Sequence, residues 1–142
     1  MEAVVIDLSL GREQKAQEGF VLALHTAEKL GSDICLLVGS KGHFPDSLIQ
    51  YFLPADKADL LSSKGNIVLD GIRLRLESSH TISKSTPTPV LFVVYDWSEI
   101  IPKVKRALGV KQLIVLAPNN EEAQTWQNEF VRNNGDSLCR AQ

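Results

Sequence analysis

The sequence predicts an α/β fold, a three-layer Rossmann-like sandwich with a mostly parallel central sheet. Four short runs are apolar throughout, as strands are when helices cover both faces of a parallel sheet. Segments with apolar residues at helical spacing alternate with these runs, which is the order of βαβ units. The net charge of -2 is near neutral, and no apolar stretch approaches the roughly 20 residues that cross a bilayer. We therefore expect a cytoplasmic protein.

The first half of the chain is expected to alternate strands and helices. Ala16, Phe20 and Ala27 recur at helical spacing, which gives one apolar stripe, and Gly31 follows as a helix stop. The expected elements are a strand at 3–8, a helix at 12–30, a strand at 34–38, a helix with Pro45 in its first turn that Pro54 ends, and a helical turn at 58–62.

An antiparallel hairpin is expected at about 66–77. Asp70-Gly71 separates two strand-like runs, and both residues of such a turn must accept a positive φ. The second run alternates apolar residues with Arg73 and Arg75, which is typical of a half-exposed strand at a sheet edge. We predict this edge as a partner-binding surface, with these two arginines as its candidate residues.

The second half is expected to return to the strand and helix alternation after a loop at 78–89. Asn119 and Glu122 have the spacing of a capping box at the start of the last helix. The expected elements are a strand at 90–95, a helix at 98–108 capped by Ser98, a strand at 112–117, and a helix that Gly135 ends. Residues 1–135 then form one domain, and 136–142 form a frayed tail.

Polar residues follow each of the four apolar runs. Carboxyl ends of parallel strands lie at one rim of a sheet, where ligands of α/β proteins bind. Lys41 suits a phosphate and His43 a general acid or base, while Asp7 and Asp96 suit a divalent cation if their strands are neighbours. Serine, aspartate and asparagine are also the usual residues of turns and helix caps. The candidate rim residues are Asp7, Ser9, Ser40, Lys41, His43, Asp96 and Asn119.

None of the familiar site motifs is complete in this chain. Gly39-Ser40-Lys41-Gly42 lacks the length and the Gly-Lys-Ser/Thr of a Walker A loop. No G-x-G-x-x-G follows the first strand. Asp7-Leu8-Ser9-Leu10-Gly11 has glycine where the D-x-S-x-S metal site of von Willebrand A domains has its second serine. The three histidines are isolated and have no ligand pair for zinc.

The incomplete motifs favour a non-catalytic cytoplasmic module that binds a small ligand or a protein partner through the rim or the hairpin edge. The alternative is a metal-dependent hydrolase or transferase acting on a phosphate ester or nucleotide, so the sequence leaves open whether the protein is an enzyme. No cofactor is expected, and Mg²⁺ or Mn²⁺ at Asp7 and Asp96 belongs to the alternative only.

Candidate partners are another protein, a second copy in a homodimer, or a small anion. The absence of a basic excess argues against nucleic acid, and we expect no membrane binding. Cys35 is expected to be a small buried hydrophobe in a reducing compartment.

Overall fold

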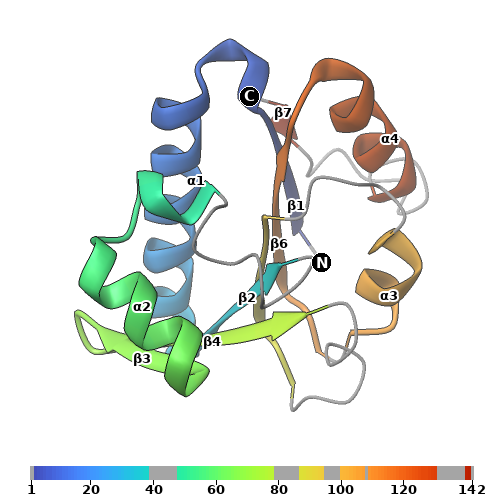
Figure 1. Ribbon diagram of the computed structural model, residues 1–142. Coiled ribbons are helices and arrows are strands. Elements are labelled where there is room, and N and C mark those ends of the chain that lie inside the picture. The colour runs from blue at the N-terminus through green and yellow to red at the C-terminus, as the bar shows by residue number, and fades with distance from the viewer. Residues whose placement is uncertain are drawn as a thin grey trace.

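The computed structural model describes residues 2–38, 48–78, 87–94, 100–107, 109–130 and 140–141 (Figure 1). Strands and helices alternate along most of this chain. The strands are β1 (Glu2–Asp7), β2 (Ile34–Val38), β3 (Asn66–Leu69), β4 (Ile72–Ser78), β5 (Val90–Val93), β6 (Gln112–Ala117) and β7 (Arg140–Ala141). The helices are α1 (Arg12–Leu30), α2 (Ala55–Lys64), α3 (Ile101–Lys105) and α4 (Asn120–Phe130), with 3-10 turns η1 (Leu8–Leu10) and η3 (Leu48–Tyr51).

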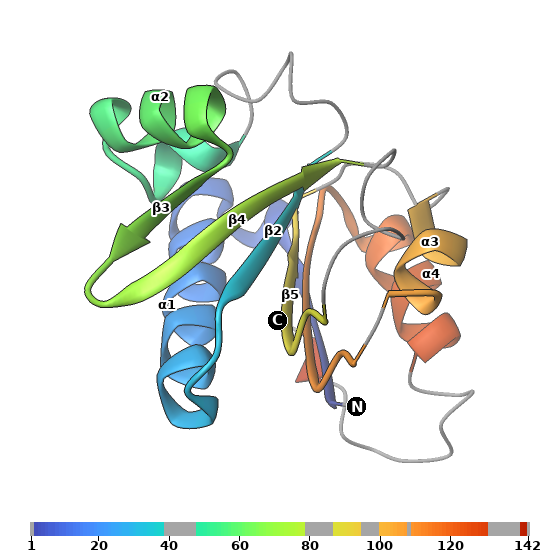
Figure 2. The same cartoon turned by 90° about the horizontal axis from the view of Figure 1, so that it is seen from below.

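The strands form one seven-stranded sheet in the order β3-β4-β2-β5-β6-β1-β7. The pairing is parallel throughout, except between β3 and β4. Helices α1 and α2 cover one face of the sheet, and α3 and α4 cover the other (Figures 1 and 2). The predicted α/β sandwich, with a mostly parallel sheet and an antiparallel hairpin, is confirmed.

Two hydrophobic cores fill the spaces between the sheet and its helices. Neighbouring residues of a strand point to opposite faces, so Phe92 enters the core under α1 and α2, while Leu91 enters the core under α3 and α4. Gly19 lets α1 approach the sheet closely, because a Cβ at this position would lie 2.9 Å from Cδ2 of Leu116. Both faces of the inner strands are buried, and this is the reason that their sequences are apolar throughout.

Several elements have the bounds that the sequence predicts. Helix α1 begins at Arg12 and ends before Gly31, which has a left-handed φ of 62°. The hairpin turn has positive φ at both central residues, 51° at Asp70 and 81° at Gly71, as a two-residue turn between antiparallel strands requires. Strands β2 and β6 also cover the predicted residues.

The segment between β2 and β3 differs from the prediction. Residues 39–47, which include Pro45, lie outside the described part of the chain, and η3 is a single 3-10 turn. Helix α2 is ten residues long rather than the expected turn at 58–62. Pro54 takes the position before this helix, with φ −59° and ψ 152°, and its carbonyl accepts from the Ala58 N–H. Proline therefore precedes a helix here, in the extended conformation that is typical of an N-cap residue.

The later elements are shorter than predicted, and the chain ends differently. Described residues place β5 at Val90–Val93 and α3 at Ile101–Lys105, while the expected helix cap Ser98 and helix stop Gly135 are outside them. Arg140–Ala141 forms β7, which pairs with Val4 and Val5 of β1. This part of the expected frayed tail is therefore a strand, and 136–139 and 142 lie outside the described residues.

Candidate functional site

The strand order produces two topological switch points at the carboxyl rim of the sheet. Strands β1 and β6 are neighbours, yet the chain leaves β1 toward α1 on one face and β6 toward α4 on the other (Figure 1). Strands β2 and β5 are also neighbours, and they lead to η3 and α2 on one face and to α3 on the other. Ligands of open α/β sheets bind at such switch points, because diverging connections leave a crevice between the strand ends.

The predicted rim residues divide between the strands that form these two switch points. Asp7, Ser9 and Asn119 lie in or directly after β1 and β6. The other candidates follow β2 and β5 in the sequence and lie outside the described residues; they are Ser40, Lys41, His43 and Asp96. The structure therefore places the strands of the first group, β1 and β6, side by side. Strand β5, which precedes Asp96, pairs with the other side of β6.

Asp7 closes the turn that follows β1. It is the last residue of the strand, is 8% exposed and pairs with Ala117 of β6. Its Oδ1 accepts hydrogen bonds from the Ser9 backbone N–H at 2.9 Å and the Ser9 hydroxyl at 2.6 Å. These two bonds fix η1 and so direct the chain into α1. The capping interpretation of Asp7 therefore has direct support in the geometry.

Asn119 has the same kind of role at the start of α4. Its Oδ1 accepts from the Glu122 backbone N–H at 2.9 Å, and its carbonyl accepts from the Ala123 N–H at 3.0 Å. Within the described part of the chain, the buried Oε2 of Glu122 has no hydrogen-bond partner. One of the two bonds of the predicted capping box is thus confirmed, and the returning bond from Glu122 is not formed by this oxygen.

The strand order does not meet the condition for an ion shared by Asp7 and Asp96. Strand β6 lies between β1 and β5, and two strand spacings are about 10 Å. Two oxygens that ligate one Mg²⁺ or Ca²⁺ lie within about 5 Å of each other, given ligand distances of about 2.0–2.6 Å. Among the described residues no group of three or more His, Cys, Asp or Glu side chains is placed to hold a metal ion.

Removing the Asp7 carboxylate is expected to destabilise the domain. Asp7→Ala deletes both bonds to Ser9, and loss of a cap costs about 0.5–2 kcal/mol of the free energy of unfolding. Ser9→Ala keeps the bond from the backbone N–H, so its effect should be smaller. Asp7→Asn keeps a carbonyl oxygen as acceptor and serves as the matched control. Urea unfolding measures all three, and an Asp7→Ala protein as stable as the wild type would contradict this role.

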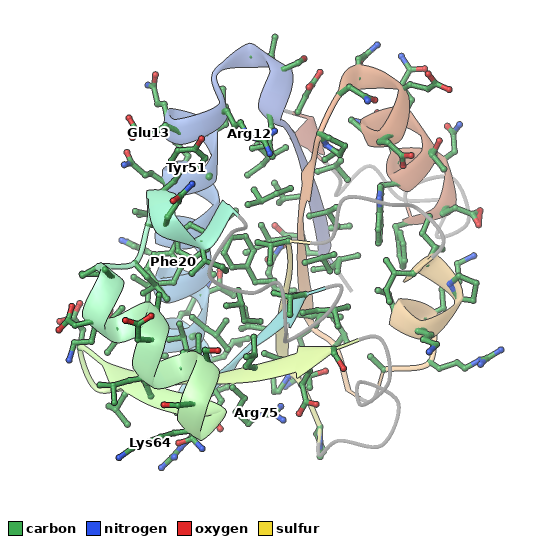
Figure 3. All side chains as sticks on the ribbon, in the orientation of Figure 1. Arg12, Glu13, Phe20, Tyr51, Lys64 and Arg75 are labelled. Carbon is green, nitrogen blue, oxygen red and sulfur yellow. The ribbon has the colours of Figure 1, made fainter. Side chains whose placement is uncertain are left out.

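The arginines of the predicted edge lie one strand inside it, which corrects that prediction. Strand β4 pairs with β3 on one side and β2 on the other, so β3 is the edge. Arg75, which is labelled in Figure 3, forms ion pairs with Glu77 at 3.3 Å and Asp33 at 3.9 Å. Arg73 donates from Nη1 to Asn66 Oδ1 at 2.9 Å. The alternation of apolar and charged residues identified the exposed face of β4, but it did not show which strand of the hairpin forms the edge of the sheet.

An apolar groove of about 520 Å³ between α1 and η3 was not predicted. Phe20 and Tyr51 are labelled on these two elements in Figure 3. The ring of Phe20 stacks on Phe52 at 4.6 Å, and Gln17 Nε2 donates to the Tyr51 carbonyl at 3.0 Å. The sequence signal that could have revealed this groove is Val21, because Val21 is apolar but lies off the buried stripe of α1. The groove is lined by Gln17, Phe20, Val21, Gln50, Tyr51, Phe52, Leu53 and Pro54.

Cys35 in β2 is a free, fully buried cysteine, as predicted. Burial raises the pKa of its thiol to about 12, and the opposing charge of Arg75 offsets only part of this effect. The thiol is therefore protonated at neutral pH. A nucleophilic cysteine needs a thiolate, so Cys35 is a packing residue.

Comparison with models of known protein families gives no match to this chain, and no curated protein matches it. Among the described helices, none is both long enough and apolar enough to cross a membrane. The geometry of the sheet and its rim is therefore what supports a function.

Proposed function

We propose that this chain is a non-catalytic, Rossmann-like module that binds a small anionic ligand in the crevice between β2 and β5. One observation carries this proposal: β2 and β5 are neighbours, and the helices that follow them, α2 and α3, pack on opposite faces of the sheet. This is the arrangement at which nucleotide-binding and related α/β domains hold their ligands. The candidate residues Ser40, Lys41 and His43 follow β2 directly, and Asp96 follows β5.

The residue types after β2 suit an anion. Lys41 supplies a positive charge for a phosphate or carboxylate, and the hydroxyl of Ser40 is a hydrogen-bond donor. Gly39 and Gly42 flank them, and glycine allows main-chain N–H groups to approach a ligand closely. A small anion is therefore the ligand class that this segment favours.

Three findings favour binding over catalysis. The carboxylate of Asp7 is engaged by Ser9, the strands before Asp7 and Asp96 are not neighbours, and the thiol of Cys35 is protonated and buried. A free thiol that needs no partner is also consistent with the cytoplasmic location that we propose.

Inorganic phosphate, pyrophosphate or a mononucleotide is expected to raise the Tm of the protein, and Lys41→Ala should weaken that binding about tenfold or more. A hydrogen bond to a charged group contributes about 1.5–3 kcal/mol, which corresponds to this loss of affinity. Lys111→Ala is the matched control, because Lys111 is exposed and precedes β6 at the opposite rim. Isothermal titration calorimetry with each anion gives the dissociation constants.

The proposal fails if none of these anions changes the Tm, or if Lys111→Ala weakens binding as much as Lys41→Ala. Incubation of a nucleotide with the protein and Mg²⁺ separates binding from turnover. Release of phosphate at a rate that depends on the protein would favour the hydrolase alternative instead.

A further inference from the structure

Strand β3 is the outer strand of the sheet on the hairpin side (Figure 2). The Leu76 N–H donates to the Gly65 carbonyl at 2.9 Å, so these two residues are a hydrogen-bonded pair of the antiparallel ladder. Hydrogen-bonded and non-hydrogen-bonded pairs alternate along such a ladder. With the observed register, Asn66 and Val68 are in non-hydrogen-bonded pairs. Their main-chain N–H and C=O groups therefore point away from β4, toward the open edge.

Proteins protect an exposed edge strand by making it very short, by a charged residue, a proline or a bulge in it, or by a covering segment. Strand β3 is short, with four residues, but it lacks the protecting features that its own residues could supply. The sequence of β3 is Asn-Ile-Val-Leu, with neither charge nor proline, and its register with β4 is unbroken. The side chain of Val68 is 56% exposed. An edge strand without charge, proline or bulge and with an exposed valine is a surface that favours pairing with another strand.

We propose that this strand is supplied by a second copy of the chain, so that two β3 strands pair antiparallel across a two-fold axis. One register allows the outward-pointing N–H and C=O groups of the two β3 strands to hydrogen-bond to each other. In this register Asn66 lies opposite Val68 of the second copy, and the two Ile67 residues meet at the axis. Each of the two Asn66–Val68 pairs then exchanges two N–H···O bonds. The surface is separate from the rim, so this dimer does not depend on the proposed ligand site.

The charges of α2 favour this symmetric arrangement. Helix α2 packs over β3 and β4, with Asp56 in its first turn and Lys64 in its last. The two-fold axis of an antiparallel strand pair is perpendicular to the sheet, so it places the two α2 helices antiparallel on the same face. The start of each helix, where Asp56 stands beside Lys57, then lies toward the end of the other helix, where Lys64 stands. A self-complementary surface of this kind is what an isologous dimer requires.

Repulsion between the arginines of the two copies does not oppose the pairing. Arg73 is exposed and lies on β4, next to Val68. Three strand spacings, about 14 Å, would separate the two β4 strands. This exceeds the Debye length of about 8 Å at physiological ionic strength, beyond which exposed charges are largely screened.

Sedimentation equilibrium over micromolar to millimolar protein tests the dimer. Wild-type protein is expected to dimerise, and Val68→Lys and Val68→Pro should raise the dissociation constant at least about tenfold. Proline removes the outward N–H while sparing the ladder to β4, and edge strands tolerate proline. Val68→Thr keeps the N–H, the β-branch and the shape, so it should change the constant less than about threefold. The main-chain amides of Asn66 and Val68 should become protected from hydrogen exchange as the concentration rises.

Val21→Lys is the control for charge alone, because Val21 is 55% exposed and lies on α1. It should leave the dimer intact. A wild-type protein that stays monomeric at millimolar concentration overturns the proposal. So does a dimer that Val21→Lys weakens as much as Val68→Lys, since the interface would then lie on α1. Circular dichroism confirms that each variant is folded before its association is measured.

Discussion

Replacing Phe92 with alanine is expected to lower the free energy of unfolding by about 3–5 kcal/mol. Phe92 is in β5 and is fully buried in the core under α1 and α2. Its ring centroid lies 5.5 Å from that of Phe52 and 6.3 Å from that of Phe20. The ring therefore links the sheet to α1 and to the segment after η3, and its removal leaves a cavity that all three surround.

Phe92→Leu is the matched control, because it keeps an apolar side chain and most of the volume. It should cost less than about 1.5 kcal/mol. Guanidinium unfolding followed by circular dichroism measures both variants. If Phe92→Ala costs no more than Phe92→Leu, the packing of α1 and η3 on the sheet would differ from the arrangement described. Because β5 borders the proposed ligand crevice, loss of anion binding in a still folded Phe92→Ala protein would tie this core to the rim.

The elements that the sequence predicted correctly are those that depend on residues close to one another in the chain. The stripe of α1 and its stop at Gly31 depend on residues within a few turns of one another. The Asp70-Gly71 turn depends on the φ angles of two residues. Strands β2 and β6 are apolar on both faces, because each face packs on a different core. In each case the pattern and its physical reason lie in the same short segment.

Strand order could not be predicted, because it depends on contacts between distant segments. Strand β1 pairs with β6 and β7, which come more than a hundred residues later. The apolar run of a buried strand is the same whichever strand lies beside it. For this reason the sequence grouped Asp7 with Asp96, although β6 separates their strands. Pro54 shows a related ambiguity, since proline both ends one helical segment and begins another.

The candidate site was predicted in part. Asp7 and Asn119 have the cap bonds that their residue types favour at strand ends. The location of the proposed ligand site depends on which neighbouring strands are followed by helices on opposite faces of the sheet, so the sequence identified the rim but not the switch points. Likewise, alternation in the hairpin revealed an exposed face through Arg73 and Arg75, whereas the pairing shows that the open edge belongs to β3.

Alkaline pH is expected to reduce the stability of the wild-type protein through Cys35. Burial raises the pKa of this thiol from 9.0 to about 12 in the folded protein. Above pH 9 the unfolded chain loses the proton while the folded protein keeps it, so the unfolded state gains stability. The contribution is fully present below pH 9 and is lost as the pH rises toward 12. The free energy of unfolding should fall by about 1.4 kcal/mol per pH unit in this window.

The comparison with Cys35→Ala isolates this effect from other groups that titrate at high pH. The variant should be less stable than the wild type at pH 7, because it leaves a small cavity in β2. Urea unfolding at pH 8 and pH 10.5 should show this difference shrinking by about 2 kcal/mol, since only the wild type has a thiol to ionise on unfolding. A difference that stays constant would mean that the thiol ionises equally in both states. That result would place Cys35 at an accessible position and make it a candidate nucleophile.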